Sequence, residues 1–122
     1  FDHLKAHWSS CSVDLPNLPN TSYIYDICNS LPVSIMRIKG CTQIGDKKEF
    51  VYFERTPNGK VSIRPFNGVP ITGSKLLTIG PGSEPSLLEK AIKIVCQDIN
   101  WYSKKYYELN CNHNYYPLFI NT

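Results

Sequence analysis

Two histidines near opposite ends of the chain, His7 and His113, are the side chains best suited to acid–base chemistry. In a ribonuclease that works without a metal, one imidazole takes the proton of the 2′-hydroxyl and a second protonates the leaving oxygen. Glu54 or Glu108 could replace one imidazole in such a pair. Since no spacing in the sequence favours an acid beside a base, we predict no catalytic residue, and binding is favoured over catalysis.

Metal and anion sites are weakly represented. Cys111 and His113 have the residue types of half a zinc site, but the chain lacks the second closely spaced ligand pair that zinc sites use. The Gly-Pro-Gly-Ser segment at 80–83 precedes an expected helix start, where backbone amides can hold an anion. No Gly-Lys-Ser or Gly-Lys-Thr follows it, and Glu84 adds negative charge there. We therefore predict neither a metal nor a cofactor.

Five cysteines are spread over almost the whole chain, and none lies at the short spacing of a zinc knuckle or a redox pair. They are predicted to form structural disulfides with one thiol left over: Cys11, Cys28, Cys41, Cys96 and Cys111. Disulfides persist in oxidising compartments. The sequon Asn20-Thr21-Ser22 makes Asn20 a glycosylation candidate. The first residue is not Met, as expected after removal of a signal peptide. The prediction is a secreted protein, extracellular or delivered into a host.

The composition is that of a globular protein, with 42% hydrophobic and 19% charged residues. Its apolar runs fall far short of the roughly 20 residues that span a bilayer, so we expect no membrane insertion. The net charge of +3 favours anionic partners only weakly, because the 13 Lys and Arg are dispersed along the chain. A host protein is the expected partner, and RNA is a partner that this charge pattern allows but does not indicate.

Residues 1–21 are predicted to be an irregular arm and loop, because prolines and asparagines interrupt this segment. Residues 22–122 are predicted to be a single α+β domain. Hydrophobic alternation within it predicts strands at 23–27 and 33–38. Further strands are expected at 50–53, which is apolar on both faces, at 61–63 after a turn, and at 76–79. The dipeptide Asn58-Gly59 supplies the positive φ angles that a tight hairpin turn needs.

The period then changes to spacings of three and four residues, which predicts one long C-terminal helix over 84–107. Ser83 suits the cap of this helix. The predicted architecture is therefore an antiparallel sheet packed against that helix. Cys96 falls on the buried side of the helix and is predicted to join it to the sheet by a disulfide, to Cys28 or Cys41.

The last quarter of the chain holds more aromatic residues than one helix face can bury, and tyrosine tolerates a half-exposed contact surface. The predicted partner-binding residues are Lys104, Lys105, Tyr107, Tyr115 and Tyr116. The apolar tail at 110–122 is expected to return to the sheet as an edge strand.

The segment Tyr25-Asp26-Ile27-Cys28 and the late Cys111, in a small chain rich in Asn, Tyr, Ile and Lys, resemble the effectors that plant-pathogenic fungi secrete into host cells. The resemblance is mainly compositional. It implies a ribonuclease-like fold without activity and recognition by host immunity. The function expected on this basis is a secreted, non-enzymatic interaction protein that binds a host macromolecule. The alternative is a secreted ribonuclease-like protein.

A second resemblance is to the lipid-recognition family that includes the Toll-receptor co-receptors. It rests on Trp8-x-x-Cys11, the segments 22–28 and 31–35, Cys41, and Val95-Cys96 with Cys111. It implies a lipid-binding β-sandwich, which the helix predicted over 84–107 opposes. Lipid binding is therefore the second alternative.

Overall fold

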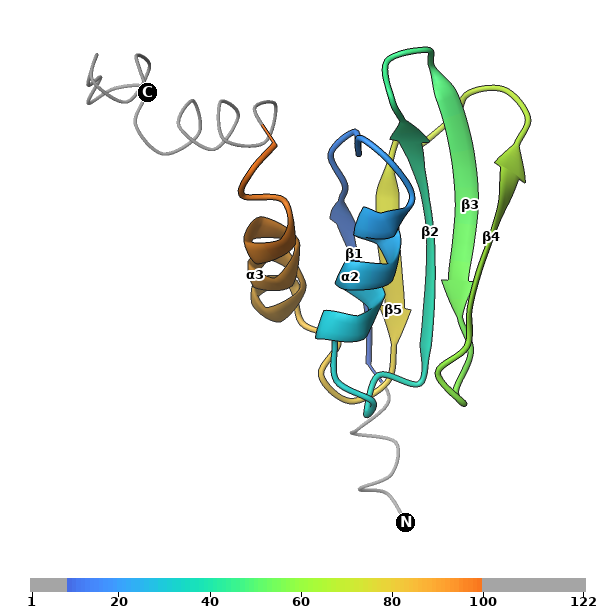
Figure 1. The fold of residues 1–122 in the computed structure, drawn as a ribbon. Coiled ribbons are helices and arrows are strands. Elements are labelled where there is room, and N and C mark those ends of the chain that lie inside the picture. The colour runs from blue at the N-terminus through green and yellow to red at the C-terminus, as the bar shows by residue number, and fades with distance from the viewer. Residues whose placement is uncertain (1–8, 100–122) are drawn as a thin grey trace, which may run out of the picture.

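The computed structural model describes residues 9–99, which form one sheet of five strands and two helices (Figure 1). The strands are β1 (Ser10–Asp14), β2 (Arg37–Ile44), β3 (Glu49–Arg55), β4 (Val61–Phe66) and β5 (Lys75–Ile79). The helices are α2 (Ser22–Ser30) and α3 (Pro85–Val95). The predicted α+β class with an antiparallel sheet is confirmed.

The strand order is β1-β5-β2-β3-β4, and every neighbouring pair is antiparallel. Hairpins join β2 to β3 and β3 to β4. The second hairpin turns at the predicted dipeptide Asn58-Gly59, where Gly59 has a φ of 89°. The chain after β4 crosses back and inserts β5 between β2 and β1, so the first strand pairs with a strand far along the sequence.

Both helices pack on one face of this sheet (Figure 1). Helix α2 buries Ile24, Ile27 and Cys28, and helix α3 buries Leu88, Ala91 and Ile92. The strands contribute every second residue to the same cluster, among them Val13, Ile38, Phe53 and Leu76. This period of two is what a strand with one buried face requires. The hydrophobic core therefore lies between the helices and a single face of the sheet.

Gly40 on β2 makes room for the ring of Phe53, its cross-strand partner on β3. A Cβ atom on Gly40 would lie only 2.2 Å from Phe53 Cζ. Phe53 is fully buried and is the bulkiest of the fully buried side chains in residues 9–99. The missing side chain at position 40 thus allows the largest ring of the core to cross the neighbouring strand.

The strand predicted at 23–27 is wrong, because these residues belong to helix α2. Aromatic and aliphatic side chains alternate there as in a strand, but Ile24, Ile27 and Cys28 also recur at the spacing of a helix. So short a segment satisfies both periods. Packing of the second set against the sheet decides between them, and the strand predicted at 33–38 begins only at Arg37.

The predicted irregular N-terminal segment also needs correction where the structure describes it, because β1 lies within it and pairs with β5. Helix α3 is shorter than the helix predicted over 84–107: it ends at Val95, and Cys96 is its C-cap. Residues 100–107 and the edge strand expected at 110–122 lie outside the described residues.

The predicted disulfide framework is not present in the described part of the chain, where Cys11, Cys28, Cys41 and Cys96 are free thiols. Cys111 lies outside it. Cys28 and Cys96 belong to the core on the helix side of the sheet. Cys41 lies between the buried Gly40 and Thr42 on β2 and therefore faces the other side. The sheet itself separates Cys41 from Cys96.

Candidate functional site: the open face of the sheet

The face of the sheet opposite the helices is not covered by any element of residues 9–99 (Figure 1). We call it the open face. Successive side chains of a strand point to opposite faces. On β2, Ile38 and Thr42 are buried under the helices, so Arg37, Lys39 and Cys41 project from the open face. The pairing register carries the same rule to the neighbouring strands.

Four basic side chains lie on the open face, on three different strands: Arg37 and Lys39 on β2, Arg64 on β4 and Lys75 on β5. Lys75 Nζ forms an ion pair with Asp14 Oδ1 across the β1–β5 pair, at 2.5 Å. The other three make no ion pair within residues 9–99. Glu54, the cross-strand partner of Lys39, adds one carboxylate to this face, so the surface keeps a net positive charge.

Three aromatic side chains lie among these basic residues: Phe50, Tyr52 and Phe66. Phe50 and Phe66 are direct partners across β3 and β4, and Phe50 and Tyr52 are two residues apart on β3, which corresponds to about 7 Å. The guanidinium carbon of Arg64 lies 4.6 Å from the centroid of the Tyr52 ring. This is a cation–π contact that places a positive charge against an aromatic ring on an exposed surface.

Tyr52 also donates a hydrogen bond from its hydroxyl to Glu54 Oε1, at 3.1 Å. Partial burial of Tyr52 and its bond to Glu54 raise the pKa of the hydroxyl, although the nearby cations Arg64 and Arg37 lower it. The net shift is upward from the ordinary value of 10.0. The hydroxyl of Tyr52 is therefore un-ionised at physiological pH.

This combination of rings and cations suits an extended anionic ligand that carries planar groups. Cations can contact the negative charges, and aromatic rings can stack on flat π-surfaces. A compact metal ion is not suited to it, and no group of three His, Cys, Asp or Glu side chains within residues 9–99 could hold one. None of the helices described is long and apolar enough to cross a membrane.

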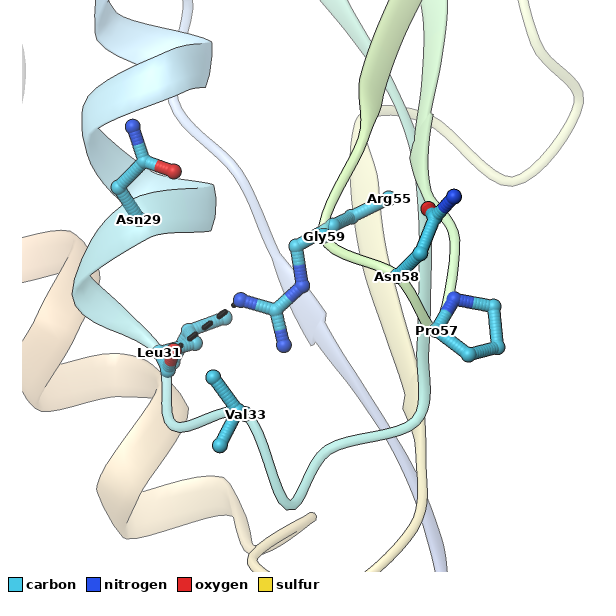
Figure 2. A pocket seen from close by; sticks show the side chains of 7 residues that line it. All are labelled: Asn29, Leu31, Val33, Arg55, Pro57, Asn58 and Gly59. Carbon is cyan, nitrogen blue, oxygen red and sulfur yellow. Dashed lines mark hydrogen bonds between the residues drawn. The ribbon is translucent and has the colours of Figure 1, made fainter.

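A pocket lies on the other side of the sheet, at the end where α2 meets the turn between β3 and β4 (Figure 2). Its volume is about 200 Å³. Its lining consists of Asn29, Leu31, Val33, Arg55, Pro57, Asn58 and Gly59. Arg55 is the last residue of β3, and its side chain extends under the end of α2. There its guanidinium donates hydrogen bonds to backbone carbonyl oxygens.

Most of the residues singled out in the sequence lie outside the described part. These are the five predicted partner-binding residues, both terminal histidines and Glu108. Glu54 lies on the open face, where it accepts the bond from Tyr52. Asn20 is exposed, and its Oδ1 accepts a hydrogen bond from the Ser22 amide at 2.9 Å. Whether Asn20 carries a glycan stays a prediction.

Sequence reasoning missed the open face because its basic residues are far apart along the chain. The available signal was the alternation within β2, where Arg37 and Lys39 occupy every second position beside buried neighbours. The register that adds Arg64 and Lys75 to them is a property of the sheet. Basic residues that are far apart in the sequence therefore lie on one face of the folded sheet.

No protein-family model matches the chain, and no curated protein matches it. Among solved structures, the fold is similar to the crystal structure of the Zn(II)-bound YjiA GTPase from E. coli, with a TM-score of 0.56 and 17% identity. A Zn(II)-bound triple mutant of that GTPase is similar as well, with a TM-score of 0.55 and 15% identity. Each match covers 73% of this chain and 30% of the GTPase chain. At such identity the likeness shows the fold alone.

The expected function is corrected on the basis of the fold. The structures that share the fold belong to a GTPase and not to a secreted effector, so the effector function and its ribonuclease-like alternative are corrected. The lipid-binding β-sandwich is contradicted too, because the described residues form one sheet covered by helices on one face. Fungal origin, secretion and a host-protein partner are tested by none of these findings and stay predictions.

Proposed function

We propose that this protein binds single-stranded nucleic acid through the open face of its sheet. The observation that carries the proposal is the interleaving of three aromatic and four basic side chains on one uncovered surface. Single strands present both chemical features that such a surface contacts, a backbone of phosphates and a series of unstacked bases. The bases of a duplex are stacked on one another and less accessible to these rings.

In this arrangement, Tyr52 and the pair of Phe50 and Phe66 serve as stacking platforms. Each base stacked on an aromatic side chain contributes about 1–3 kcal/mol, with little dependence on sequence. Arg37 and Lys39, both on β2, contact phosphates of the bound strand. Arg64 holds the Tyr52 ring from the side of β4 and adds positive charge next to it.

The proposed function takes little from the structural neighbours. The name of those proteins states that they are GTPases, but this chain spans only 30% of their length. Hydrolysis of GTP is therefore not carried over to this protein. The shared architecture supports the α+β fold alone.

The test is fluorescence anisotropy with a labelled oligouridine, an oligothymidine of equal length and the corresponding duplex. We expect both single strands to bind more tightly than the duplex. With the two phosphate contacts made by Arg37 and Lys39, the logarithm of the association constant should fall with the logarithm of salt concentration with a slope of about −1.4. Equal binding of duplex and single strands would contradict the proposal, because charge alone would then account for the affinity.

Matched variants separate the open face from the rest of the surface. Tyr52→Ala should weaken oligouridine binding by about 5- to 150-fold, the equivalent of 1–3 kcal/mol. Tyr25→Ala removes an exposed tyrosine from α2, on the helix side, and should leave the affinity unchanged. The basic residues are tested in the same way: Lys39→Ala, on the open face, should weaken oligouridine binding, whereas Lys90→Ala, on α3, should leave the affinity unchanged. A loss of affinity in Tyr25→Ala as large as in Tyr52→Ala would rule out the open face as the site.

A further inference from the structure

The pocket beside Arg55 has no part in the proposed nucleic-acid site, because it lies on the helix side of the sheet. Figure 2 shows the Arg55 side chain reaching from β3 towards Leu31 and Val33, with the turn residues Asn58 and Gly59 nearby. The pocket has about 200 Å³ and is lined by the side chains of both the turn and the end of α2. Its chemistry is dominated by the one charged group among them.

Arg55 is only 5% exposed, although it carries a full positive charge. Its guanidinium donates four hydrogen bonds to backbone carbonyl oxygens: from Nη1 to Cys28 at 2.6 Å and Leu31 at 3.1 Å, and from Nη2 to Pro32 and Ile35 at 2.9 Å each. A guanidinium has five N–H donors. The fifth, Nε–H, has no partner within residues 9–99.

The charge of Arg55 is likewise not balanced by a carboxylate of the described chain. Burying an unpaired charge is strongly unfavourable. The four carbonyl dipoles offset part of that penalty, and one of them belongs to Cys28 near the negative end of helix α2. Dipoles do not supply a net negative charge, so the positive charge of Arg55 remains without a compensating anion.

The other lining residues define the kind of anion. Leu31, Val33 and Pro57 provide apolar walls, which suit a short aliphatic group. Asn58 Oδ1 already accepts hydrogen bonds from the Thr56 hydroxyl and the Lys60 amide. The Nδ2 donors of the same side chain are left for a ligand. An oxygen acceptor with one negative charge and an apolar stem matches this set of groups.

We propose that the pocket beside Arg55 binds a small aliphatic carboxylate, which accepts hydrogen bonds from Arg55 Nε and from the Asn58 amide nitrogen. Two sources share this chemistry, a free short-chain acid and the acidic side chain of a peptide. Inorganic phosphate shares the negative charge but has no apolar stem. The experiment therefore compares sodium butyrate, a blocked glutamate amide and sodium phosphate, with sodium chloride at equal ionic strength as the reference.

The readout is the thermal unfolding midpoint of the full chain under reducing conditions. Butyrate or the blocked glutamate should raise the midpoint with a saturable dependence on concentration, because a ligand that binds only the folded state stabilises it. The larger of the two shifts identifies the source, and phosphate should give a smaller one. Equal midpoints in butyrate, blocked glutamate and chloride would overturn the proposal.

Two variants make the same chemical change at the two Asn-Gly dipeptides of the described chain. Asn58→Asp keeps an acceptor for the Thr56 hydroxyl and the Lys60 amide but puts a negative charge into the pocket. It should raise the midpoint without ligand and abolish the response to butyrate. Asn67→Asp changes an exposed residue in the loop after β4, outside the pocket, and should do neither. A butyrate response that survives in Asn58→Asp would also overturn the proposal.

Oligouridine binding should be unaffected by both variants. The test of the pocket and the test of the open face can therefore fail independently of one another.

Discussion

The two faces of the sheet use the same residue type in opposite ways. Arg55 on β3 points to the helix side, where it is buried and donates to four carbonyl groups. Arg64 on the adjacent strand β4 points to the open face, where it is exposed and lies over Tyr52. The first arginine ties the end of α2 to the sheet, and the second is available to a ligand. The position of a residue along its strand, odd or even, decides which role it has.

The largest expected effect comes from removing the buried arginine. Arg55→Ala should lower the free energy of unfolding by about 3–5 kcal/mol, because it leaves four carbonyl groups, three of them in buried hydrogen bonds, without their donor. Arg64→Ala should change it by about 0.5 kcal/mol or less, as for other exposed positions. Urea denaturation of both variants measures the difference. Similar losses in the two would mean that the faces do not differ as the structure shows.

Packing on the covered face can be tested at Gly40. Gly40→Ala places a Cβ atom against the buried ring of Phe53 and should destabilise the fold by about 1–3 kcal/mol. The adjacent Cys41→Ala alters a side chain on the open face and should have an effect below about 1 kcal/mol. Chemical denaturation provides the measurement. Adding Phe53→Leu to Gly40→Ala should recover part of the loss, and additive effects of the two changes would argue against a direct clash.

The buried thiols predict a pH dependence at the alkaline end. Burial raises the pKa of Cys28 from 9.0 to about 11 and that of Cys96 to about 12. Because both folded values lie above the unfolded one, their contribution to stability is fully present below pH 9 and is lost as the pH rises through 11 and 12. Denaturation curves between pH 8 and 10.5 should show the onset of this loss.

The buried thiols should also react more slowly than the thiol on the open face. At pH 8, iodoacetamide should modify the half-buried Cys41 faster than the fully buried Cys28 and Cys96. Peptide mapping after alkylation distinguishes the sites. Labelling of Cys28 as fast as Cys41 in the folded protein would contradict the placement of the helix-side core.

The smallest expected effect concerns the ion pair on the open face. Asp14→Asn removes the partner of Lys75, and since the carboxylate side chain is 84% exposed, stability should change by about 0–1 kcal/mol. The freed Lys75 adds one positive charge to the open face, so oligouridine should bind somewhat more tightly. Anisotropy at low salt checks this. Weaker binding in Asp14→Asn would place the nucleic acid away from β5.

Parts of the fold could be predicted from local sequence alone. The hairpin at Asn58-Gly59 and the strand at 76–79 are confirmed, because a turn dipeptide marks the first and a short apolar run marks the second. The start of α3 is confirmed near Pro85, because proline suits the first position of a helix. The cap predicted at Ser83 is wrong, since the N-cap residue is Glu84. Helix α2 was missed because residues 23–27 within it satisfy two periods at once, and only contacts with the distant sheet select the helix.

The candidate sites were less accessible to prediction. The prediction rested on the aromatic C-terminal quarter, which lies outside the described residues. The open face and the Arg55 pocket both combine residues from different strands and turns. Their members are unremarkable one by one, since a lone arginine or tyrosine in a strand has many ordinary roles.

The sequence by itself determined the class of this fold, because alternation, turn dipeptides and helix-start residues act over a few neighbouring positions. It also determined which residues of each strand share a face, since that depends only on the period of two. The tertiary structure decided which face the helices cover, which strands are neighbours and which thiols lie apart. These outcomes depend on the crossing of β5 between β1 and β2 and on the burial of α2. The free energy of such long-range pairing comes from contacts among many residues that are distant in the sequence. No short segment therefore contains enough information to predict it.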